Sequence, residues 1–200
     1  MAVDGGIGFF VKNGVKPDCF LGDMDSAAGY ERAAWNLGLS TECICEAPVK
    51  KDDTDMALAV KKAWEAGCEE ILVFGGMGGE RISHTLANIQ LMHAYAKKDC
   101  HIVMVSESCR MEVLCKGVKA FSKEMRGLLS VFSLTDMTER VKIEGLQYGF
   151  QGNLSNDCAL GVSNAFMGKE GRISIEGEGC LLLVYENEET GETADEWQGR

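Results

Sequence analysis

The stretch ILVFGGMGG at residues 71–79 is a short apolar run that ends in a cluster of glycines. Three earlier runs that favour β-strands end in carboxylates, which are Asp4, then Asp23 and Asp25, then Asp52, Asp53 and Asp55. In a parallel sheet the carboxyl ends of all strands lie along one edge, where open α/β sheets bind their ligands. The sequence therefore predicts a crevice in which carboxylates and a glycine loop bind phosphate through a metal ion.

Strand and helix patterns alternate through the first half of the chain. We expect strands at 19–21, 42–46, 71–74 and 101–105, and helices that end at Gly14 or cover 27–37, 54–66 and 83–97. Thr54 has the side chain of an N-cap for the helix at 54–66. Because strands that alternate with helices form parallel sheets, this half predicts a doubly wound, Rossmann-like sheet.

After residue 110 the segments become short, rich in β-forming residues, and separated by Gly, Asn or Asp. We expect strands at 111–114, 128–134, 140–146, 159–166, 172–175 and 180–185, which is the pattern of an all-β sandwich. The fold class predicted is thus α/β, with an N-terminal doubly wound parallel sheet followed by a C-terminal all-β sandwich. The expected domains are residues 1–110 and 111–185, with the boundary near 106–118 and a disordered acidic tail at 186–200.

Composition excludes several classes of function. The formal net charge of -11 would repel nucleic acid, and no run of apolar residues is long enough to span a membrane. Nine cysteines without a CxxC pair, and no signal peptide, predict reduced thiols in a cytoplasmic protein. The three histidines have no spacing typical of a zinc site, so any metal ion should be bound by oxygen.

The segment Gly22-Asp23-Met24-Asp25-Ser26 places two carboxylates at the end of a predicted strand. Carboxylate oxygens are hard ligands that suit Mg²⁺ bound to phosphate. A solvated turn explains an isolated motif of this kind equally well. The acidic segment at 51–55, taken alone, fits helix capping better than catalysis.

The glycine loop is followed by Arg81 and His84 at the start of a predicted helix. Exposed backbone N–H groups and a guanidinium at such a junction commonly hold phosphate. The loop lacks both the GKS ending of a P-loop and the GxGxxG spacing of a dinucleotide fold. For His84, orienting a neighbouring loop fits better than proton transfer.

Taken together and in order, these segments resemble the thiamine pyrophosphokinase family. The resemblance rests on AVDGG at 2–6, PD at 17–18, GDMDS at 22–26, KDDTD at 51–55, the glycine loop with Arg81, HTLAN at 84–88, GVSN at 161–164 and GCLLL at 179–183. It covers residues 2–185, and the ordered combination is far more specific than any single segment.

The resemblance implies a Mg²⁺-dependent enzyme that transfers the terminal diphosphate of ATP to the hydroxyl of thiamine, giving thiamine diphosphate and AMP. It implies a homodimer with thiamine bound where domains of two subunits meet. The residues implied as catalytic are Asp23, Asp25, Asp55 and Arg81, and the metal ligands implied are Asp23, Asp25 and Asp55. Those implied to bind ATP are Asp4, Gly5, Gly22, Asp52, Thr54, Gly75, Gly78, Gly79, Arg81 and His84. Those implied to bind thiamine are Lys51, Ser163 and Asn164.

The chain departs from the family pattern in two places. The loop carries an extra Glu80, and Ser83 stands where the family has an aspartate, so a negative charge is missing there. Only Ala2 and Val3 precede Asp4, whereas the family has a strand and a glycine-containing loop before this segment. We therefore expect the chain to be shortened at its N-terminus and to lack an element that helps to hold ATP.

Two alternatives stay open at this point. Residues 20–26 also resemble the motif of haloacid-dehalogenase-type phosphatases, in which Asp23 would form a phosphoaspartate and Asp25 would be the acid/base. That family needs a later lysine and an acidic strand end, and nothing suitable follows residue 105. The other alternative is a thiamine- or nucleotide-binding module without catalysis.

Overall fold

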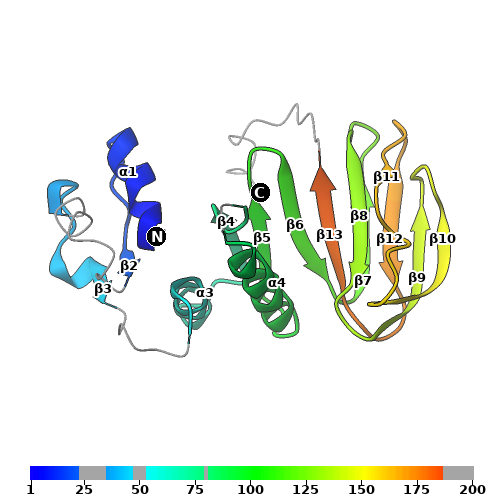
Figure 1. Cartoon of the computed structure of the whole chain (residues 1–200), viewed down its shortest axis with the longest axis horizontal. Coiled ribbons are helices and arrows are strands. Elements are labelled where there is room, and N and C mark those ends of the chain that lie inside the picture. The colour runs from blue at the N-terminus through cyan, green and yellow to red at the C-terminus, as the bar shows by residue number, and fades with distance from the viewer. Residues whose placement is uncertain (23–34, 47–52, 79–80, 187–200) are drawn as a thin grey trace. The chain divides into compact units, whose positions relative to one another are not determined.

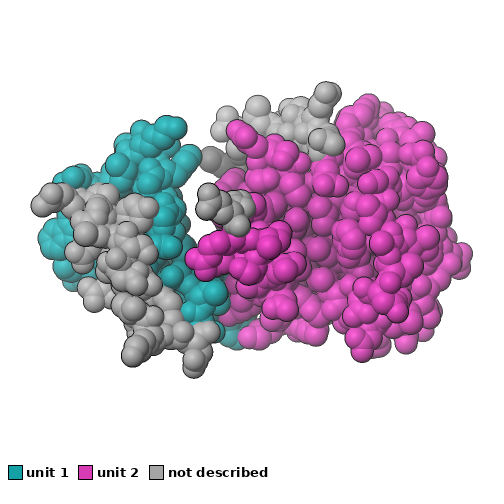
Figure 2. All heavy atoms as spheres, viewed as in Figure 1, with its two compact units in different colours: residues 1–69 teal, residues 70–200 magenta. Residues whose placement is uncertain are grey.

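The computed structural model describes residues 1–22, 35–46, 53–78 and 81–186. It divides the chain into two compact units, residues 1–69 and residues 70–200, which are coloured separately in Figure 2. Within the described ranges, no helix is long and apolar enough to cross a membrane.

The first unit contains three short parallel strands in the order β1-β2-β3. The strands are β1 (Ala2–Val3), β2 (Phe20–Gly22) and β3 (Ile44–Glu46), and the helices are η1 (Asp4–Gly6), α1 (Ile7–Asn13), η2 (Thr41–Cys43) and α3 (Asp55–Glu65). Helix α1 ends at Gly14, whose φ of 63° confirms the predicted glycine stop.

Helices cover both faces of this small sheet because neighbouring residues of a strand point to opposite sides. Phe20 packs with Ile7 of α1 in one apolar cluster, whereas Leu21 packs with Ala59 of α3 in another. The parallel strands are therefore present in this unit, as are the helices predicted to end at Gly14 and to cover 54–66.

The second unit is built from two sheets and one long helix, α4 (Ile82–Ala96). The six-stranded sheet has the order β11-β8-β13-β6-β5-β4, and the four-stranded sheet has the order β10-β9-β12-β7 (Figure 1). The strands are β4 (Glu70–Phe74), β5 (His101–Val105), β6 (Cys109–Leu114), β7 (Gly117–Phe121), β8 (Leu128–Ser133), β9 (Met137–Glu144), β10 (Phe150–Ser155), β11 (Asn164–Ala165), β12 (Gly171–Ile175) and β13 (Leu181–Glu186). Strands β4 and β5 are parallel, and every other pairing between the described strands of this unit is antiparallel.

The two sheets of the second unit enclose one apolar core, so the predicted sandwich is present. Fully buried side chains come from both sheets, with Leu129, Leu181 and Leu183 on the six-stranded sheet and Val141 and Ile173 on the four-stranded one. The short segments rich in β-forming residues, on which the prediction rested, thus supply the strands around this core.

The compact units divide between residues 69 and 70, whereas the sequence predicted a domain boundary near 106–118, which stays a prediction. Residues 106–108 instead form the turn of a hairpin, in which Val103 pairs with Glu112 and joins β5 to β6. Since β4 and β5 belong to the sheet of the sandwich, a single Rossmann-like parallel sheet is not confirmed.

Three details of the strand prediction also change. Strands β7 and β10 were not predicted, and the strand expected at 159–166 is reduced to Asn164–Ala165. Gly161 and Ser163 explain the reduction: a methyl group on Gly161 would lie 2.3 Å from the carbonyl oxygen of Val131, and Ser163 has a φ of 55°. The helix expected at 27–37 falls largely outside the described residues, as does nearly all of the acidic tail at 186–200.

The prediction of reduced thiols is wrong for one pair. Cys115 and Cys180 form a disulfide across a sequence separation of 65. Strands β6 and β13 pair with Leu114 opposite Leu181, so the residue after one strand faces the residue before the other. The other described cysteines are free thiols.

Candidate functional site

Asp4 and Gly22 lie side by side where β1 and β2 end. Val3 pairs with Leu21, and Asp4 and Gly22 are the next residues along the two chains. A methyl group on Gly22 would lie 3.6 Å from Cα of Asp4, which is van der Waals contact, so the two residues are neighbours in space. Asp4 has a φ of 43°, which is uncommon for a residue with a side chain and is often found where backbone is held for function. The carboxyl ends of these two strands therefore meet, as the sequence predicted.

Asp55 lies in the first turn of α3, and this helix packs on the face of the sheet that carries Leu21. Ala59 of α3 belongs to the apolar cluster of Leu21, which is the residue before Gly22. Near the end of α3, Lys62 donates a hydrogen bond to Sγ of Cys45 in β3. The helix that begins at Asp55 is therefore held against the parallel strands.

Thr54 caps this helix as predicted. Its hydroxyl accepts a hydrogen bond from the backbone N–H of Ala57, with a distance of 3.1 Å. The acidic Asp55 occupies the first turn, where the helix dipole favours negative charge. A possible role of Thr54 in binding ATP stays a prediction.

Several predicted residues fall outside the described ranges, namely Asp23, Asp25, Lys51, Asp52 and Gly79. Within the residues that are described, no group of three His, Cys, Asp or Glu side chains is arranged to hold a metal ion. Of the three predicted metal ligands, Asp55 is the one that lies within the described residues. The predicted metal centre at Asp23, Asp25 and Asp55 thus stays a prediction.

In the second unit the glycine loop follows β4 and is fastened to α4. Gly75 and Gly78 have φ values of 72° and 79°, a conformation that favours glycine. The side-chain amide of Asn88 donates to the carbonyl of Gly76 at 2.6 Å, and the N–H of Gly78 donates to the hydroxyl of Thr85 at 3.2 Å. The loop is therefore held in shape by the first half of the helix.

Gly76 fits this loop because there is no room for a larger residue. A methyl group at this position would lie 2.8 Å from Cγ1 of Val73 and 3.1 Å from Sδ of Met104. Neither Thr85 nor Asn88 was singled out from the sequence, although both occur in the HTLAN segment. The sequence signal that could have identified them is their spacing. The buried residues of α4 are three or four positions apart, namely Thr85, Asn88, Met92 and Tyr95.

The polar side chains of the loop and helix start face solvent. Arg81 is the N-cap residue of α4, and its carbonyl accepts from the N–H of His84. Arg81, Ser83 and His84 are all exposed, so the guanidinium and imidazole can reach a ligand. Since the N–H of Gly78 already binds Thr85, the loop's other N–H groups are better placed to hold an anion.

The two described residues predicted to bind thiamine have different surroundings. Ser163 is exposed and lies in the left-handed region, with its N–H bound to the hydroxyl of Ser130 at 3.0 Å. Asn164 is only 5% exposed. Its side-chain oxygen accepts from the N–H of Tyr148 at 2.9 Å, and its side-chain nitrogen donates to the carbonyl of Tyr148 at 2.7 Å. Asn164 thus fixes the backbone at Tyr148.

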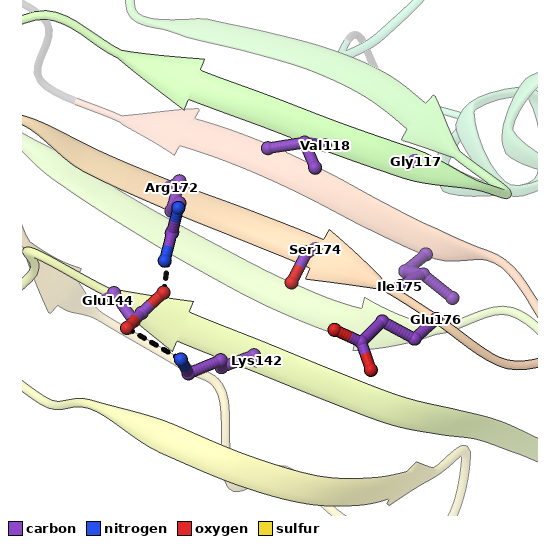
Figure 3. A pocket seen from close by; sticks show the side chains of 8 residues that line it. All are labelled: Gly117, Val118, Lys142, Glu144, Arg172, Ser174, Ile175 and Glu176. Atoms are coloured by element: carbon purple, nitrogen blue, oxygen red, sulfur yellow. Dashed lines mark hydrogen bonds and ion pairs between the residues drawn. The ribbon is translucent and has the colours of Figure 1, made fainter.

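The outer face of the four-stranded sheet has a hollow whose lining includes none of the predicted site residues (Figure 3). Within it Glu144 pairs with Arg172 at 2.5 Å and with Lys142 at 2.8 Å. Hydrogen bonds from Arg172 and then Lys142 lower the pKa of the Glu144 carboxyl. These charges neutralise one another at the surface, and they do not form part of the site predicted from the sequence.

Comparison with known proteins gives a consistent picture. A family model described as the catalytic domain of thiamin pyrophosphokinase matches residues 1–104. Thiamine pyrophosphokinase from Bacillus subtilis is 25% identical over 186 residues, which cover 92% of this chain and 85% of that protein. Thiamine pyrophosphokinase 1 from Arabidopsis thaliana is 25% identical over 191 residues, which cover 90% of this chain and 69% of that protein.

Solved structures show that the fold is shared as well. The crystal structure of thiamine pyrophosphokinase from Bacillus subtilis matches with a TM-score of 0.82 at 24% identity, covering 92% of this chain and 85% of that one. The enzyme from Candida albicans matches with a TM-score of 0.72 at 15% identity, covering 92% and 81%. Because the family model matches more than half of its residues, the chain belongs to the thiamine pyrophosphokinase family.

Proposed function

We propose that this chain is a diphosphotransferase that moves the terminal diphosphate of ATP to the hydroxyl of thiamine, producing thiamine diphosphate and AMP. The observation that carries the proposal is the meeting of Asp4 and Gly22 at the carboxyl ends of two parallel strands, in the region that the family model matches. Asp55 is in the first turn of the helix that packs on these strands. Family membership sets aside the phosphatase alternative, in which Asp23 would form a covalent intermediate.

The carboxylates suit a hard divalent cation such as Mg²⁺. Such ions prefer carboxylate oxygens and usually keep phosphate oxygens among their ligands. Asp55 lies at the start of α3, and the sequence places Asp23 and Asp25 directly after β2. We assign these three residues to the metal ion, with Asp4 supporting the same edge. When bound, the ion would neutralise charge on the polyphosphate.

We assign the glycine loop and Arg81 to binding the phosphate groups of ATP, through backbone N–H donors and a guanidinium. Arg81 presents an exposed guanidinium, and the loop conformation at Gly75 and Gly76 is fixed by Asn88. Fixed donors aimed at developing charge lower a reaction barrier because they need no reorganisation during the reaction. We assign His84 to orienting this segment, because it begins α4 beside Arg81.

The reaction needs no covalent intermediate on the protein. The hydroxyl oxygen of thiamine forms a bond to the β-phosphorus of ATP, and the bond from that phosphorus to the oxygen bridging to the α-phosphate breaks, which releases AMP. The hydroxyl proton passes to a carboxylate of the segment at 52–55. The protein contributes alignment of the two reactants and cancellation of their repulsion.

For thiamine we assign Lys51 and Ser163 as contacts and Asn164 as a positioning residue. The assignment of Asn164 is supported by its burial and its two hydrogen bonds to the backbone of Tyr148. We further propose that the active form is a cytoplasmic homodimer with thiamine bound at the subunit interface. Gel filtration with light scattering of the full chain tests the dimer.

The direct test compares two variants that each lose one negative charge from the first unit. Asp55→Asn should lower the rate of AMP and thiamine diphosphate formation by about 100-fold or more, because a ligand for phosphate-bound metal is lost. Glu42→Gln is the matched control, since Glu42 is exposed and precedes β3 at the opposite edge. Circular dichroism checks that both variants fold.

A near-normal rate for Asp55→Asn would remove Asp55 from the site. The remaining alternative, a binding module without catalysis, predicts a different result. Calorimetry would then detect thiamine binding to the wild-type chain while no AMP appears with ATP and Mg²⁺.

A further inference from the structure

Two thiols and an ammonium group meet on one side of the small parallel sheet. Sγ of Cys19, just before β2, lies 4.0 Å from Sγ of Cys45 in β3. Nζ of Lys62, on α3, lies 2.8 Å from Sγ of Cys45 and donates a hydrogen bond to it. Three elements distant in sequence therefore bring two sulfur atoms and one cation together.

The surroundings distinguish this pair from a chance contact of buried thiols. Both sulfurs are half-buried, and Cys45 packs with Leu21 and Ala59 between the sheet and α3. Cys43, two residues earlier, packs on the opposite face with the cluster around Phe20. Small oxidants can therefore reach the pair, while apolar side chains fix its position.

The two sulfurs have different electrostatic surroundings. Burial and then the charge of Cys45 raise the pKa of the Cys19 thiol, so Cys19 keeps its proton at neutral pH. The hydrogen bond to Cys45 and attraction to its sulfur raise the pKa of Lys62, which stays charged. Lys62 is thus placed to stabilise negative charge on Cys45 when that sulfur reacts.

We propose that Cys19 and Cys45 form a reversible dithiol–disulfide pair that reacts with hydroperoxides, with Cys45 as the attacking sulfur and Cys19 as the resolving one. This modification site is independent of the kinase reaction proposed above. It is also separate from the disulfide between Cys115 and Cys180, which lies in the other unit.

The chemistry balances with the hydroperoxide as the oxidant. The thiolate of Cys45 attacks one peroxide oxygen, the O–O bond breaks, and the leaving oxygen takes up a proton; the products are a sulfenic acid on Cys45 and water or an alcohol. The sulfur of Cys19 then attacks the sulfur of Cys45, and the hydroxide that leaves combines with the proton of Cys19. Two thiols lose two electrons, and the peroxide gains them.

Closing the bond requires movement of the segment before β2, because Cys45 is in register with Leu21 and lies diagonal to Cys19. A disulfide bond is about 2.05 Å long, so the sulfurs must approach by about 2 Å from their present separation. The bond would link the segment before β2 directly to β3, whose hydrogen bonds already align Leu21 with Cys45. The closed form would therefore stiffen the strand that carries Gly22 against Asp4.

The test uses the full chain with hydrogen peroxide at neutral pH, followed by alkylation, digestion and mass spectrometry. We expect a crosslinked peptide pair that contains Cys19 and Cys45 and that dithiothreitol reverses. Lys62→Met should slow its formation on the order of tenfold, whereas Lys62→Arg, which keeps the charge, should slow it far less. Circular dichroism establishes that the variants are folded.

Cys43 provides the internal comparison, because Cys43→Ser should leave formation of the crosslink unchanged. The proposal is overturned if Cys19 and Cys45 stay as open to alkylation as Cys43 while the exposed Cys68 and Cys158 become oxidised. An unchanged rate in Lys62→Met would also overturn it. Neither readout depends on thiamine or ATP.

Discussion

We expect Glu112→Gln to lower the free energy of unfolding by about 3 kcal/mol at neutral pH and by much less at pH 3. Glu112 is only 3% exposed, and it lies on β6 opposite Leu183 of the sandwich core. Its carboxylate accepts hydrogen bonds from Nζ of Lys119 at 2.7 Å, from Nε2 of His101 at 3.1 Å, and from the hydroxyl of Tyr185. A neutral amide cannot replace the charge that these donors surround.

The magnitude follows from the pKa of this group. Burial alone would raise the pKa of the Glu112 carboxyl, but the hydrogen bond from His101, the charge of Lys119 and the hydrogen bonds from Lys119 and Tyr185 lower it from 4.5 to about 2. That difference corresponds to about 3 kcal/mol of stability in favour of the ionised form. Because the pKa of the folded state is the lower one, this stability is fully present above pH 4.5. It is lost as the pH falls toward 2, with about 1.4 kcal/mol left at pH 3.

The assay is urea unfolding of wild type and variant, followed by circular dichroism at pH 7 and at pH 3. Glu144→Gln is the matched control, since Glu144 also has two cationic partners, Arg172 and Lys142, but lies on the outer face of the sheet. Solvent screens that group, so its replacement should change stability little at either pH. An equal loss at both pH values for Glu112→Gln, or a loss no larger than that of the control, would refute the reasoning.

Three further replacements test the local structure. Thr54→Ala should cost about 1 kcal/mol in the free energy of unfolding, because the first turn of α3 loses its cap, as a urea titration would reveal; an unchanged midpoint would contradict this. Gly76→Ala should lower the free energy of unfolding by about 1–3 kcal/mol, because the added methyl group clashes with Val73, and it should also slow AMP formation. A higher melting temperature of this variant would show that the loop has space. Asn164→Ala should raise the KM for thiamine while leaving the KM for ATP within about twofold, since it frees the backbone at Tyr148; equal changes in both constants would argue against a local effect.

Interactions between residues close in sequence could be predicted without the tertiary structure. Gly14 adopts the left-handed conformation at the end of α1, and Thr54 caps α3, because both depend on atoms within four residues. The turn after β4 could be predicted as well, because the positive φ values of Gly75 and Gly78 are a local property that favours glycine. The ordered motifs were specific enough to predict the family, which the match over residues 1–104 confirms.

Part of the candidate site was likewise predictable and part was not. The convergence of Asp4 and Gly22 follows from parallel pairing of their strands, a rule that needs only the strand order. The hydrogen bonds of Asn164 to the backbone of Tyr148 could not be predicted, because the two residues are 16 positions apart and meet only where Leu146 forms a β-bridge with Phe166.

The sequence by itself determined the three described α-helices, most of the described strands, the sandwich pattern and the family. The tertiary structure alone decided that β5 turns into β6 and extends the sandwich sheet, that Cys115 meets Cys180, and that Glu112 is buried among partners from three other strands. The physical reason is distance along the chain. Periodicity and capping report contacts within a few residues, whereas Tyr185 reaches Glu112 across 73 positions through pairing that no local pattern records.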